Sequence, residues 1–323
     1  MVNDDAAPIP LGWTGYLAAD GFEAELEREL ADAGRDVALR LGRLLFAPGI
    51  PVASAWAENV WFDPVRIPIR SIGDGAGRLR AIQRNWSFHS AGGHRRAMLI
   101  AERLPTVSAK PLRFPDPAPP SPLGSWTLAD PNTIFAAARC ASPFPNGAVR
   151  FVEDRTGPPN RAYLKLWEAL TRLGEHPKPG ERCLDLGASP GGWTWVLAGL
   201  GADVASVDKA PLAPQISALP NVRTIHASAF ALIPGDIGSI DWLFSDVVCY
   251  PERLYRLVNG WIEAGACRRI VATIKFQGAT DFAAQRLFTA IPGATLAHLH
   301  HNKHELTFFW KASGSPATPA APK

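Results

Sequence analysis

A glycine-rich turn is the part of this sequence whose residue types and spacing point most directly to chemistry. Residues 183–195 read CLDLGASPGGWTW, an apolar run followed by a turn and the start of an amphipathic segment. Its candidate ligand-binding residues are Gly187, Ser189, Pro190, Gly191, Gly192 and Trp193. Glycine permits a tight turn and lets backbone amides approach a ligand closely. The spacing is G-x-x-x-G-G and not the G-x-G-x-x-G that holds a dinucleotide pyrophosphate, so we expect a ligand without one.

An acidic residue at the end of the next predicted strand indicates what that ligand contains. Asp208 follows the apolar segment after the turn, and a carboxylate at this place can accept hydrogen bonds from both hydroxyls of a ribose. S-adenosylmethionine has an adenosine and an amino acid end but no phosphate, so it fits these terms. A nicotinamide dinucleotide, and with it an oxidoreductase, is the alternative, which a cofactor titration would distinguish.

The elements around the turn predict an α/β fold, a parallel Rossmann-like sheet covered by helices on both faces. From about residue 153 apolar strands alternate with helices, as such sheets require. Strands are expected at 183–186, 203–208, 222–227, 241–246, 269–276, 294–300 and 304–310. Helices are expected at 160–170, with Asn160 as N-cap, and at 192–200, 251–265 and 280–291. The last two strands should form an antiparallel hairpin at the end of the sheet.

Residues 1–150 are expected to form a smaller α/β domain that binds RNA. The pattern predicts a helix at 21–34, β-rich pieces at 52–62, 65–72, 97–104 and 133–140, and a proline-rich extended connector at 111–122. Residues 66–113 contain ten Lys or Arg and two acidic residues. Aromatic rings stack on unpaired bases and arginines bind phosphates, and a solvated basic face is the alternative. The candidate RNA-binding residues are Arg84, Trp86, His94, Arg95 and Arg96.

Composition limits the class of protein further. The formal net charge is +3, too small by itself to indicate a nucleic-acid-binding protein. The four cysteines lack the spacing of a metal site, and the histidines between 298 and 304 straddle the predicted hairpin, so we expect no metal. Without a signal-peptide pattern or a long apolar run, we expect a soluble, cytoplasmic protein that does not enter membranes. We also expect a monomer. Residues 312–323 should form a disordered tail.

Six segments resemble, in order, the motifs of the FtsJ-like RNA 2'-O-ribose methyltransferases. They are NRAYLKLWEAL, LDLGASPGGWTW, SVDKAPLAP, LFSDVVCYPERL, VATIKF and HHNKHELTFFW, and the likeness covers residues 150–310. The chain is most similar to the RlmM type, which methylates a cytidine ribose in bacterial 23S ribosomal RNA, because of SPFPNG followed by RF, SVDKAPLA and LVNGW. The resemblance implies an S-adenosylmethionine-dependent methyltransferase domain at residues 151–311. It also implies an RNA-binding, THUMP-containing region before that domain. The corresponding region here is shorter, and we recognise no complete THUMP domain in its sequence.

The resemblance implies four catalytic residues. They are Lys165, Asp246, Lys275 and Glu305, each on a different predicted element. Our hypothesis is that Lys275 takes the proton of the ribose 2'-hydroxyl, that Asp246 and Lys165 orient and tune it, and that Glu305 positions Lys275 or the ribose. A free lysine is protonated at neutral pH, so this role requires surroundings that favour the neutral amine, such as partial burial and a second positive charge. An isolated Lys or Glu would more simply form a surface ion pair.

The cofactor site implied by the resemblance departs from the family at one position. Ser228 stands where the family has an aspartate that contacts the adenine amine. A serine oxygen can accept the same hydrogen bond but is uncharged, so weaker cofactor binding is expected, unless Ser228 only turns the chain. Asp246 is expected to border the cofactor as well. Two alternatives remain: the same reaction on another RNA, or a non-catalytic RNA-binding or ribosome-assembly factor of the same fold.

Overall fold

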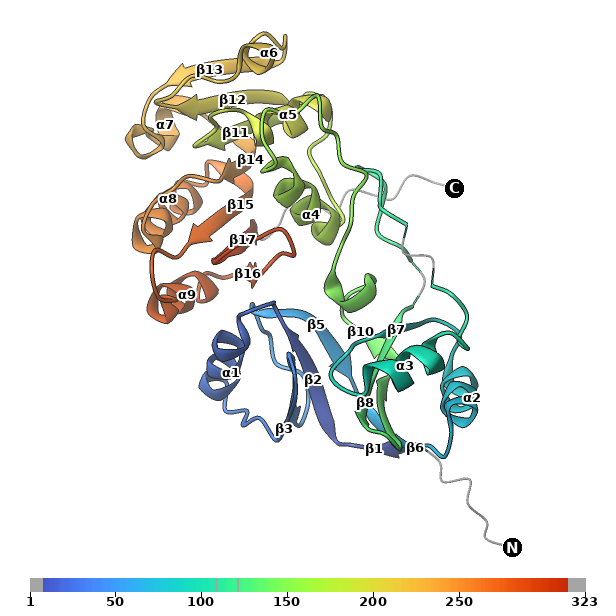
Figure 1. Cartoon of the computed structure of the whole chain (residues 1–323). Helices are drawn as coiled ribbons and strands as arrows, with labels where there is room; N and C mark the ends of the chain where they lie inside the picture. Colours follow the sequence, from blue (N-terminus) through green and yellow to red (C-terminus); the bar gives the residue numbers. More distant parts are fainter. Residues whose placement is uncertain (1–7, 108–109, 121, 313–323) are drawn as a thin grey trace, which may run out of the picture. The chain divides into compact units, whose positions relative to one another are not determined.

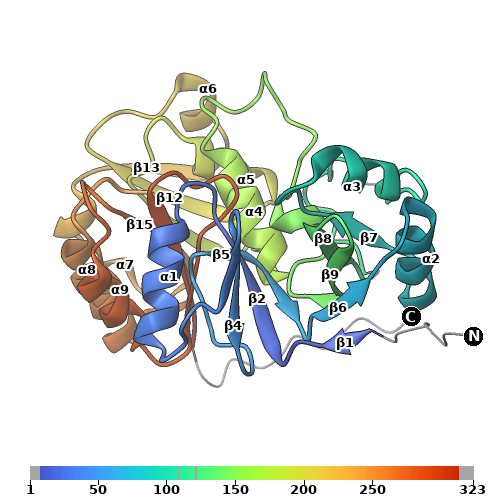
Figure 2. The same cartoon turned by 60° about the horizontal axis from the view of Figure 1, so that its bottom comes forward.

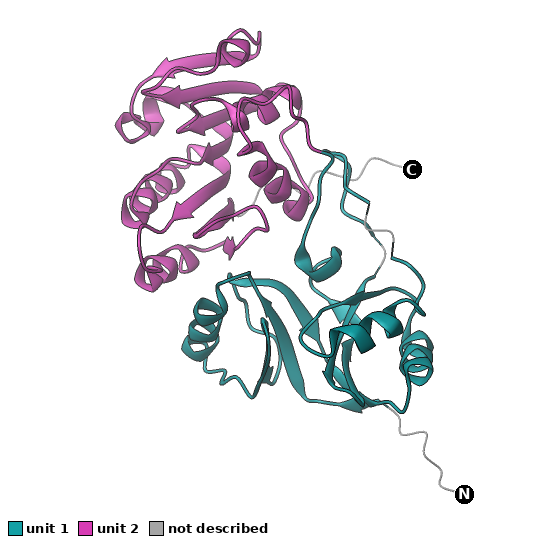
Figure 3. Cartoon of the chain, viewed as in Figure 1, with its two compact units in different colours: residues 1–152 teal, residues 153–323 magenta. Residues whose placement is uncertain are grey.

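A computed structural model describes residues 8–107, 110–120 and 122–312 and divides the chain into two compact units, residues 1–152 and 153–323 (Figure 3). The predicted tail at 312–323 lies outside the described residues apart from Ala312.

Unit 1 contains two five-stranded sheets (Figure 1). One has the order β1 (Ile9–Pro10), β6 (Val65–Pro68), β9 (Thr133–Ala137), β8 (Gly124–Asp130) and β7 (Trp86–Phe88). The other has the order β10 (Arg139–Cys140), β5 (Ala57–Phe62), β2 (Trp13–Ala18), β4 (Leu44–Pro48) and β3 (Leu39–Leu41). The helices are α1 (Glu23–Asp32), α2 (Ile72–Ile82) and α3 (His94–Ala101), with a short 3-10 helix, η1, at Pro145–Gly147. Apart from the parallel pair β7 and β8, the strand pairs are antiparallel.

Helices α2 and α3 cover one face of the sheet that contains β8 and β9 (Figure 2). Leu79 of α2 and Ile100 of α3 are fully buried in the same cluster as Trp126 of β8. The prediction of a strand at 97–104 was therefore wrong, because α3 occupies most of this segment. A short apolar run does not by itself distinguish a strand from a helix that buries one face.

Unit 2 is a seven-stranded sheet covered by helices on both faces, as the sequence predicted (Figure 1). Its order is β13 (Val222–His226), β12 (Asp203–Asp208), β11 (Arg182–Leu186), β14 (Ile240–Ser245), β15 (Cys267–Lys275), β17 (Glu305–Lys311) and β16 (Ala294–Ala297). The strands from β13 to β15 are parallel, and β17 runs antiparallel to both of its neighbours. The predicted hairpin is confirmed, with β17 between β15 and β16.

The helices of unit 2 connect these strands. They are α4 (Tyr163–Leu173), α5 (Gly192–Gly199), α6 (Pro214–Ser217), α7 (Pro234–Ile237), α8 (Pro251–Glu263) and α9 (Phe282–Thr289), with a short 3-10 helix, η2, at Ala229–Ala231. Asn160 is not the N-cap of α4, because the cap is Ala162. Instead, Asn160 Oδ1 accepts a hydrogen bond from the Ala162 amide at 3.1 Å.

The strand order reverses between β11 and β14, and this determines where a ligand can lie. From β11 the chain proceeds outward to β12 and β13, then returns to β14 on the other side of β11. The carboxyl ends of these strands carry the glycine turn, Asp208 and Asp246. In open parallel sheets, ligands bind outside these ends at such a reversal.

Candidate functional site

The three glycines of the turn are required by close packing of the chain against itself. Gly187 has φ +78°, and a Cβ there would lie 2.8 Å from Cα of Val247. A Cβ on Gly191, which has φ +114°, would lie 2.9 Å from Ile216 Cγ2, and one on Gly192 would overlap Asn160 Oδ1. The sequence interpretation attributed Gly191 and Gly192 to ligand access. The structure adds a second reason for these glycines, since protein atoms occupy the space that their side chains would need.

The turn ends at the amino end of α5, which has no side-chain cap. Gly191 is the N-cap residue and supplies no side-chain hydrogen bond. The first amides of a helix have no partner within the helix and carry partial positive charge. They can therefore bind an anionic group such as a carboxylate.

Trp193 has a packing role in this turn. It is 3% exposed, and its indole N–H donates to the Ala162 carbonyl at 3.0 Å. Its ring contacts Phe244 edge to face, with centroids 6.3 Å apart. Trp193 is among the predicted cofactor-binding residues; its indole N–H holds the chain that leads into α4.

Asp208 keeps capacity to accept further hydrogen bonds. Its Oδ2 accepts from the Ser189 amide at 3.0 Å, and its Oδ1 accepts from the Ala210 amide at 2.9 Å. Each carboxylate oxygen has two lone pairs, so both can still accept from a ribose. The Ser189 hydroxyl donates to the Pro211 carbonyl at 2.8 Å. Ser228 accepts from the Phe230 amide at 3.4 Å and caps η2, as expected for a residue that turns the chain.

The four residues predicted to be catalytic lie together in unit 2. Lys165 Nζ lies 3.0 Å from Asp246 Oδ1 and 2.6 Å from Glu305 Oε1. Lys275 Nζ lies 3.1 Å from the same Asp246 oxygen and donates to the Asp246 carbonyl at 2.6 Å. Lys275 and Glu305 also lie opposite each other in the neighbouring strands β15 and β17. Two amines and two carboxylates from four elements thus form one continuous ionic cluster.

The charges within this cluster stabilise one another. Burial opposes the charged form of Lys165, but Asp246 and Glu305 outweigh it and raise the pKa of Lys165. Burial also opposes the charged form of Asp246, but Lys165 and Lys275 outweigh it and lower the pKa of Asp246. At neutral pH, therefore, Lys165 is cationic and Asp246 is anionic. The Lys275 side chain is 20% exposed, twice the 10% of Lys165, and is the more accessible amine.

The loop after β14 adds apolar surface next to Asp246, which the sequence analysis missed. Val248 is 73% exposed and Tyr250 is 68% exposed. Large apolar side chains so exposed, two and four residues from Asp246, are available to contact a substrate. The signal in the sequence was an apolar run that continues past the end of a buried strand.

Glu168 is a second residue that the sequence analysis missed. It lies one turn of α4 after Lys165, is fully buried, and accepts hydrogen bonds from His300 and His301 in the loop between β16 and β17. Among the described residues, no group of three or more His, Cys, Asp or Glu could hold a metal ion. The histidine-rich loop thus has a partner in the fold.

In unit 1, the basic residues predicted to bind RNA are distributed differently from the aromatic one. Arg84, His94 and Arg95 are exposed and Arg96 is half-buried, the last three in the first turn of α3. Trp86 is 5% exposed, and its indole N–H is shared between the Leu79 and Gln83 carbonyls. The prediction that Trp86 contacts RNA does not fit this position, because its ring belongs to the core of unit 1.

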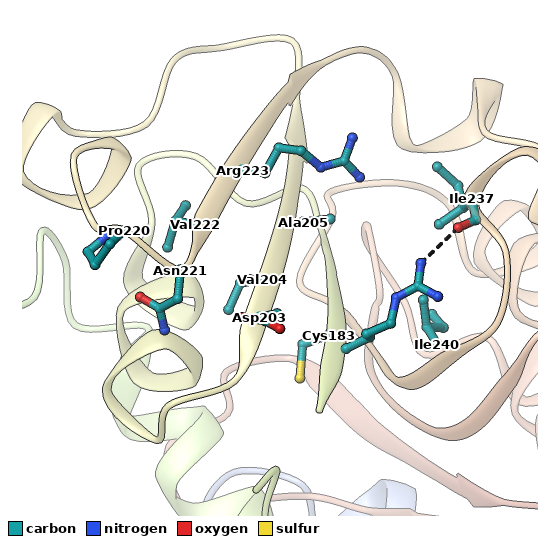
Figure 4. Close-up of a pocket in the computed structure, with 11 residues that line it drawn as sticks. Cys183, Asp203, Val204, Ala205, Pro220, Asn221, Val222, Arg223, Ile237 and Ile240 are labelled. Atoms are coloured by element: carbon teal, nitrogen blue, oxygen red, sulfur yellow. Dashed lines mark hydrogen bonds between the residues drawn. The ribbon is translucent and has the colours of Figure 1, made fainter. Parts of the chain in front are cut away.

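A cleft of about 380 Å³ lies at the amino ends of the unit 2 strands, opposite to the end that carries the glycine turn (Figure 4). It is lined at the amino ends of β11, β12 and β13 by Arg182, Asp203 and Arg223, among others. The Arg182 guanidinium donates to the Ile237 carbonyl at 3.1 Å. This cleft therefore differs from the site formed by the glycine turn and the ionic cluster, which lies at the carboxyl ends.

Across the helices of the described residues, none has the length and apolar character to cross a bilayer.

Comparison with known proteins identifies the family to which this part of the chain is related. Residues 158–252 match the family described as FtsJ-like methyltransferase. That segment includes α4, the glycine turn, Asp208 and Asp246.

Curated relatives match over more of the chain. A protein from Halorhodospira halophila, named Ribosomal RNA large subunit methyltransferase M, is 29% identical over 97% of this chain and 85% of its own length. A protein of the same name from Azoarcus sp. is 27% identical over 92% of this chain and 95% of its own length. One from Aromatoleum aromaticum is 35% identical, over 46% of this chain and 44% of its own length.

Solved structures superpose on this chain with low TM-scores. TrmN from Thermus thermophilus has a TM-score of 0.36 and 17% identity, covering 93% of this chain and 99% of its own. Fibrillarin from Aeropyrum pernix has a TM-score of 0.34 and 16% identity, covering 57% of this chain and 81% of its own.

Proposed function

Since this chain carries an FtsJ-like methyltransferase domain, we propose that it transfers a methyl group from S-adenosylmethionine to a ribose 2'-hydroxyl of ribosomal RNA. The RNA is large-subunit ribosomal RNA, as the names of the relatives state for those proteins, and the nucleotide is a cytidine of 23S rRNA. The observation that carries the proposal is the convergence of two lysines and two acids beside the glycine turn. The same site acting on another RNA is the second candidate.

The residues at the carboxyl ends of β11 and β12 fit S-adenosylmethionine. The uncapped amino end of α5 suits the carboxylate of its amino acid part. The Asp208 carboxylate retains acceptor capacity for the ribose hydroxyls. When bound, S-adenosylmethionine supplies an activated methyl group on a sulfonium. Ser228 supplies an uncharged acceptor for the adenine amine.

Lys275 is the proposed proton acceptor. A ribose hydroxyl is a weak nucleophile, so removing its proton during attack accelerates transfer, typically by about 10²- to 10⁴-fold. Lys275 is the more exposed of the two amines, whereas Lys165 is held between Asp246 and Glu305. Lys165 and Asp246 would keep the Lys275 amine in place and balance the charge around it. Correct alignment of hydroxyl and methyl group supplies further rate enhancement.

The RNA would also contact regions outside this ionic cluster. Val248 and Tyr250 offer apolar surface on which the target nucleotide can pack. Arg84, His94 and Arg95 of unit 1 offer exposed basic groups for phosphates, and Arg96 lies beside them on α3. We further propose that the protein acts as a cytoplasmic monomer.

The experiment compares the full-length wild type with Lys275→Ala and Lys275→Arg on 23S rRNA and tritiated S-adenosylmethionine. The arginine variant keeps the charge but cannot give up its proton. Both variants should lose at least a hundredfold in kcat while the Kd for S-adenosylmethionine, measured by calorimetry, stays within about twofold. Lys178→Ala, which removes an exposed lysine before β11, is the matched control. Substantial activity in either Lys275 variant would remove the proton-acceptor role.

The target nucleotide requires a separate measurement. Ribose methylation is mapped across total RNA from cells with and without the gene. Loss of one cytidine 2'-O-methyl group in 23S rRNA is the expected result. Loss of a position in another RNA would favour the second candidate, and an unchanged map would contradict the proposed function.

A further inference from the structure

Glu168 is a fully buried carboxylate with an unusually complete set of hydrogen-bond donors. Its Oε1 accepts from the His300 amide at 2.8 Å and from Arg172 Nε at 2.9 Å. Its Oε2 accepts from the His301 amide at 3.0 Å and lies 2.7 Å from His301 Nδ1. Burial opposes the charged form, but His301, Arg172 and His300 outweigh it and lower the pKa of Glu168. The side chain is therefore an anion held inside the protein.

Most of these donors belong to a loop far away in the sequence. Residues 298–304 connect β16 to β17, and they reach Glu168 across more than 130 positions. Arg172, on the next turn of α4, is a local partner. Glu168 thus fixes the position of this loop relative to α4.

The loop in turn holds Glu305, the first residue of β17. The Lys303 amide donates to Glu305 Oε1 at 3.4 Å, and Asn302 Nδ2 donates to the Glu305 carbonyl at 3.2 Å. Glu305 Oε1 is the atom that lies 2.6 Å from Lys165 Nζ. Helix α4 is therefore joined to this segment at two points, to the first residue of β17 through Lys165 and to the preceding loop through Glu168.

The two points lie on the same side of one helix. Residues three apart are neighbours on a helix surface, so Lys165 and Glu168 face the same end of the β16–β17 hairpin. An ionic contact with a side chain alone leaves a long lysine able to adopt other rotamers, because holding it in one rotamer costs side-chain entropy. Contacts from Glu168 to two backbone amides fix the loop itself, and a charged buried group is retained only where its partners are well arranged.

We propose that Glu168 is a positioning residue, which anchors the β16–β17 loop to α4 so that Glu305 holds the Lys165 amine beside Asp246. It does not touch the reacting atoms. This inference rests on the proposed function, because the amine that it positions is one of the four residues of that site.

The first test does not depend on methyl transfer. Wild type and Glu168→Gln, both full-length, are treated with trace acetic anhydride, and acetylation of each lysine is followed by peptide mass spectrometry. Lys165 should react slowly in the wild type, since it is 10% exposed and paired with two carboxylates. In the variant, one carboxylate oxygen is replaced by an NH₂ group, which cannot accept a hydrogen bond from the loop amides. Lys165 should then react at least fivefold faster, relative to exposed Lys178, than in the wild type.

The second test separates positioning from a general structural role. In Glu168→Gln, kcat should fall at least tenfold while the Kd for S-adenosylmethionine stays within about twofold. Arg172→Ala is the matched control, since it removes a charged partner of Glu168 but leaves the loop donors, and its kcat should stay within about threefold of wild type. If Glu168→Gln does not fold, His301→Ala removes one loop donor, and its Lys165 should react about twice as fast as in the wild type.

The outcomes distinguish this inference from the proposed function. Unchanged Lys165 reactivity in a folded variant, or a parallel loss of kcat and cofactor affinity, would overturn the positioning role. If the wild type transfers no methyl group to RNA but Lys165 reactivity rises in the variant, the proposed function fails and the anchoring of Lys165 by Glu168 stands.

Discussion

Asp185, buried in the middle of β11, should make unit 2 less stable as the pH rises. It is 1% exposed, and its Oδ2 accepts from the Thr194 hydroxyl at 2.7 Å. Thr194 Oγ1 also lies 2.9 Å from Ser206 Oγ of β12, so the three side chains join β11, α5 and β12 behind the glycine turn. Burial raises the pKa of Asp185 to about 7, the Thr194 hydrogen bond opposes this, and Asp246 and Asp208 add to it.

The direction of this pH effect on stability follows from the pKa of Asp185 in the folded and unfolded states. The unfolded chain releases this proton near pH 3.8, whereas the folded protein retains it until about pH 7. Between these values the folded state binds more protons, so its free energy of unfolding falls as pH rises. The stabilising effect is complete below about pH 3.8 and disappears as the pH rises through about 7. At about 1.4 kcal/mol per pKa unit, the change between about pH 5 and pH 8 is on the order of 2–3 kcal/mol.

The variant Asp185→Asn tests this expectation, because it keeps the shape of the side chain but does not titrate. Urea unfolding of the full chain is followed by hydrogen exchange in peptides from β11 and α5, so that the signal comes from unit 2. The stability of the wild type minus that of the variant should fall by about 2–3 kcal/mol from about pH 5 to pH 8. Asp203→Asn, which removes an exposed carboxylate at the start of β12, is the control and should show no such trend. An equal difference at both pH values would refute the assignment.

Three further predictions concern the ligand sites. Gly192→Ala should destabilise the protein by about 1 kcal/mol, because its Cβ would displace Asn160 Oδ1 and break the hydrogen bond that this atom accepts from the Ala162 amide. Adding Asn160→Ala, which removes the same hydrogen bond, should cost little more in urea unfolding, and a neutral Gly192→Ala would contradict this reasoning. Asp208→Asn should raise the Kd for S-adenosylmethionine at least tenfold in calorimetry with kcat at saturation within about threefold, and unchanged affinity would exclude a ribose contact. Arg84→Ala combined with Arg95→Ala should weaken RNA binding and reduce the slope of log affinity against log salt concentration by about one for each phosphate that these arginines neutralise. An affinity equal to that of the wild type at all salt concentrations would mean that the RNA binds elsewhere.

The sequence predicted the strands of unit 2 well because of how a parallel sheet is buried. With helices on both faces, its strands are short continuous apolar runs bounded by turns, as at 183–186 and 241–246. The strands of unit 1 pair mostly antiparallel over long sequence separations, for example β6 with β9. Such pairing leaves little trace in local pattern, which is why β2 was not predicted. The strands β4 and β8 were also not predicted, although each pairs with an adjacent strand in a short hairpin. Helix α3 was taken for a strand because a short apolar run fits either element.

The site was predictable only where chemistry is carried by a residue type within a recognisable motif. Lys165, Asp246 and Lys275 were identified in this way, and the structure brings them within hydrogen-bonding distance. Glu168 was not found, because its partners include two backbone amides, and no sequence pattern shows which amide a buried acid will reach. Trp86 was misjudged for the opposite reason, since an aromatic residue next to arginines has the composition of an RNA-binding surface whether its ring is outside or inside.

The packing of the glycine turn explains why the cofactor site and the ionic cluster must form together. Gly192 leaves room for Asn160, and the Trp193 indole holds the Ala162 carbonyl. Both contacts fix the chain that enters α4, and Lys165 lies in the first turn of that helix. The turn proposed to bind the cofactor therefore also helps to determine where the Lys165 amine lies. Because a displacement of about 1 Å can cost a hundredfold in rate, a shared anchor keeps the proposed methyl-donor site aligned with Lys165, and through Asp246 with Lys275, better than two independent loops would.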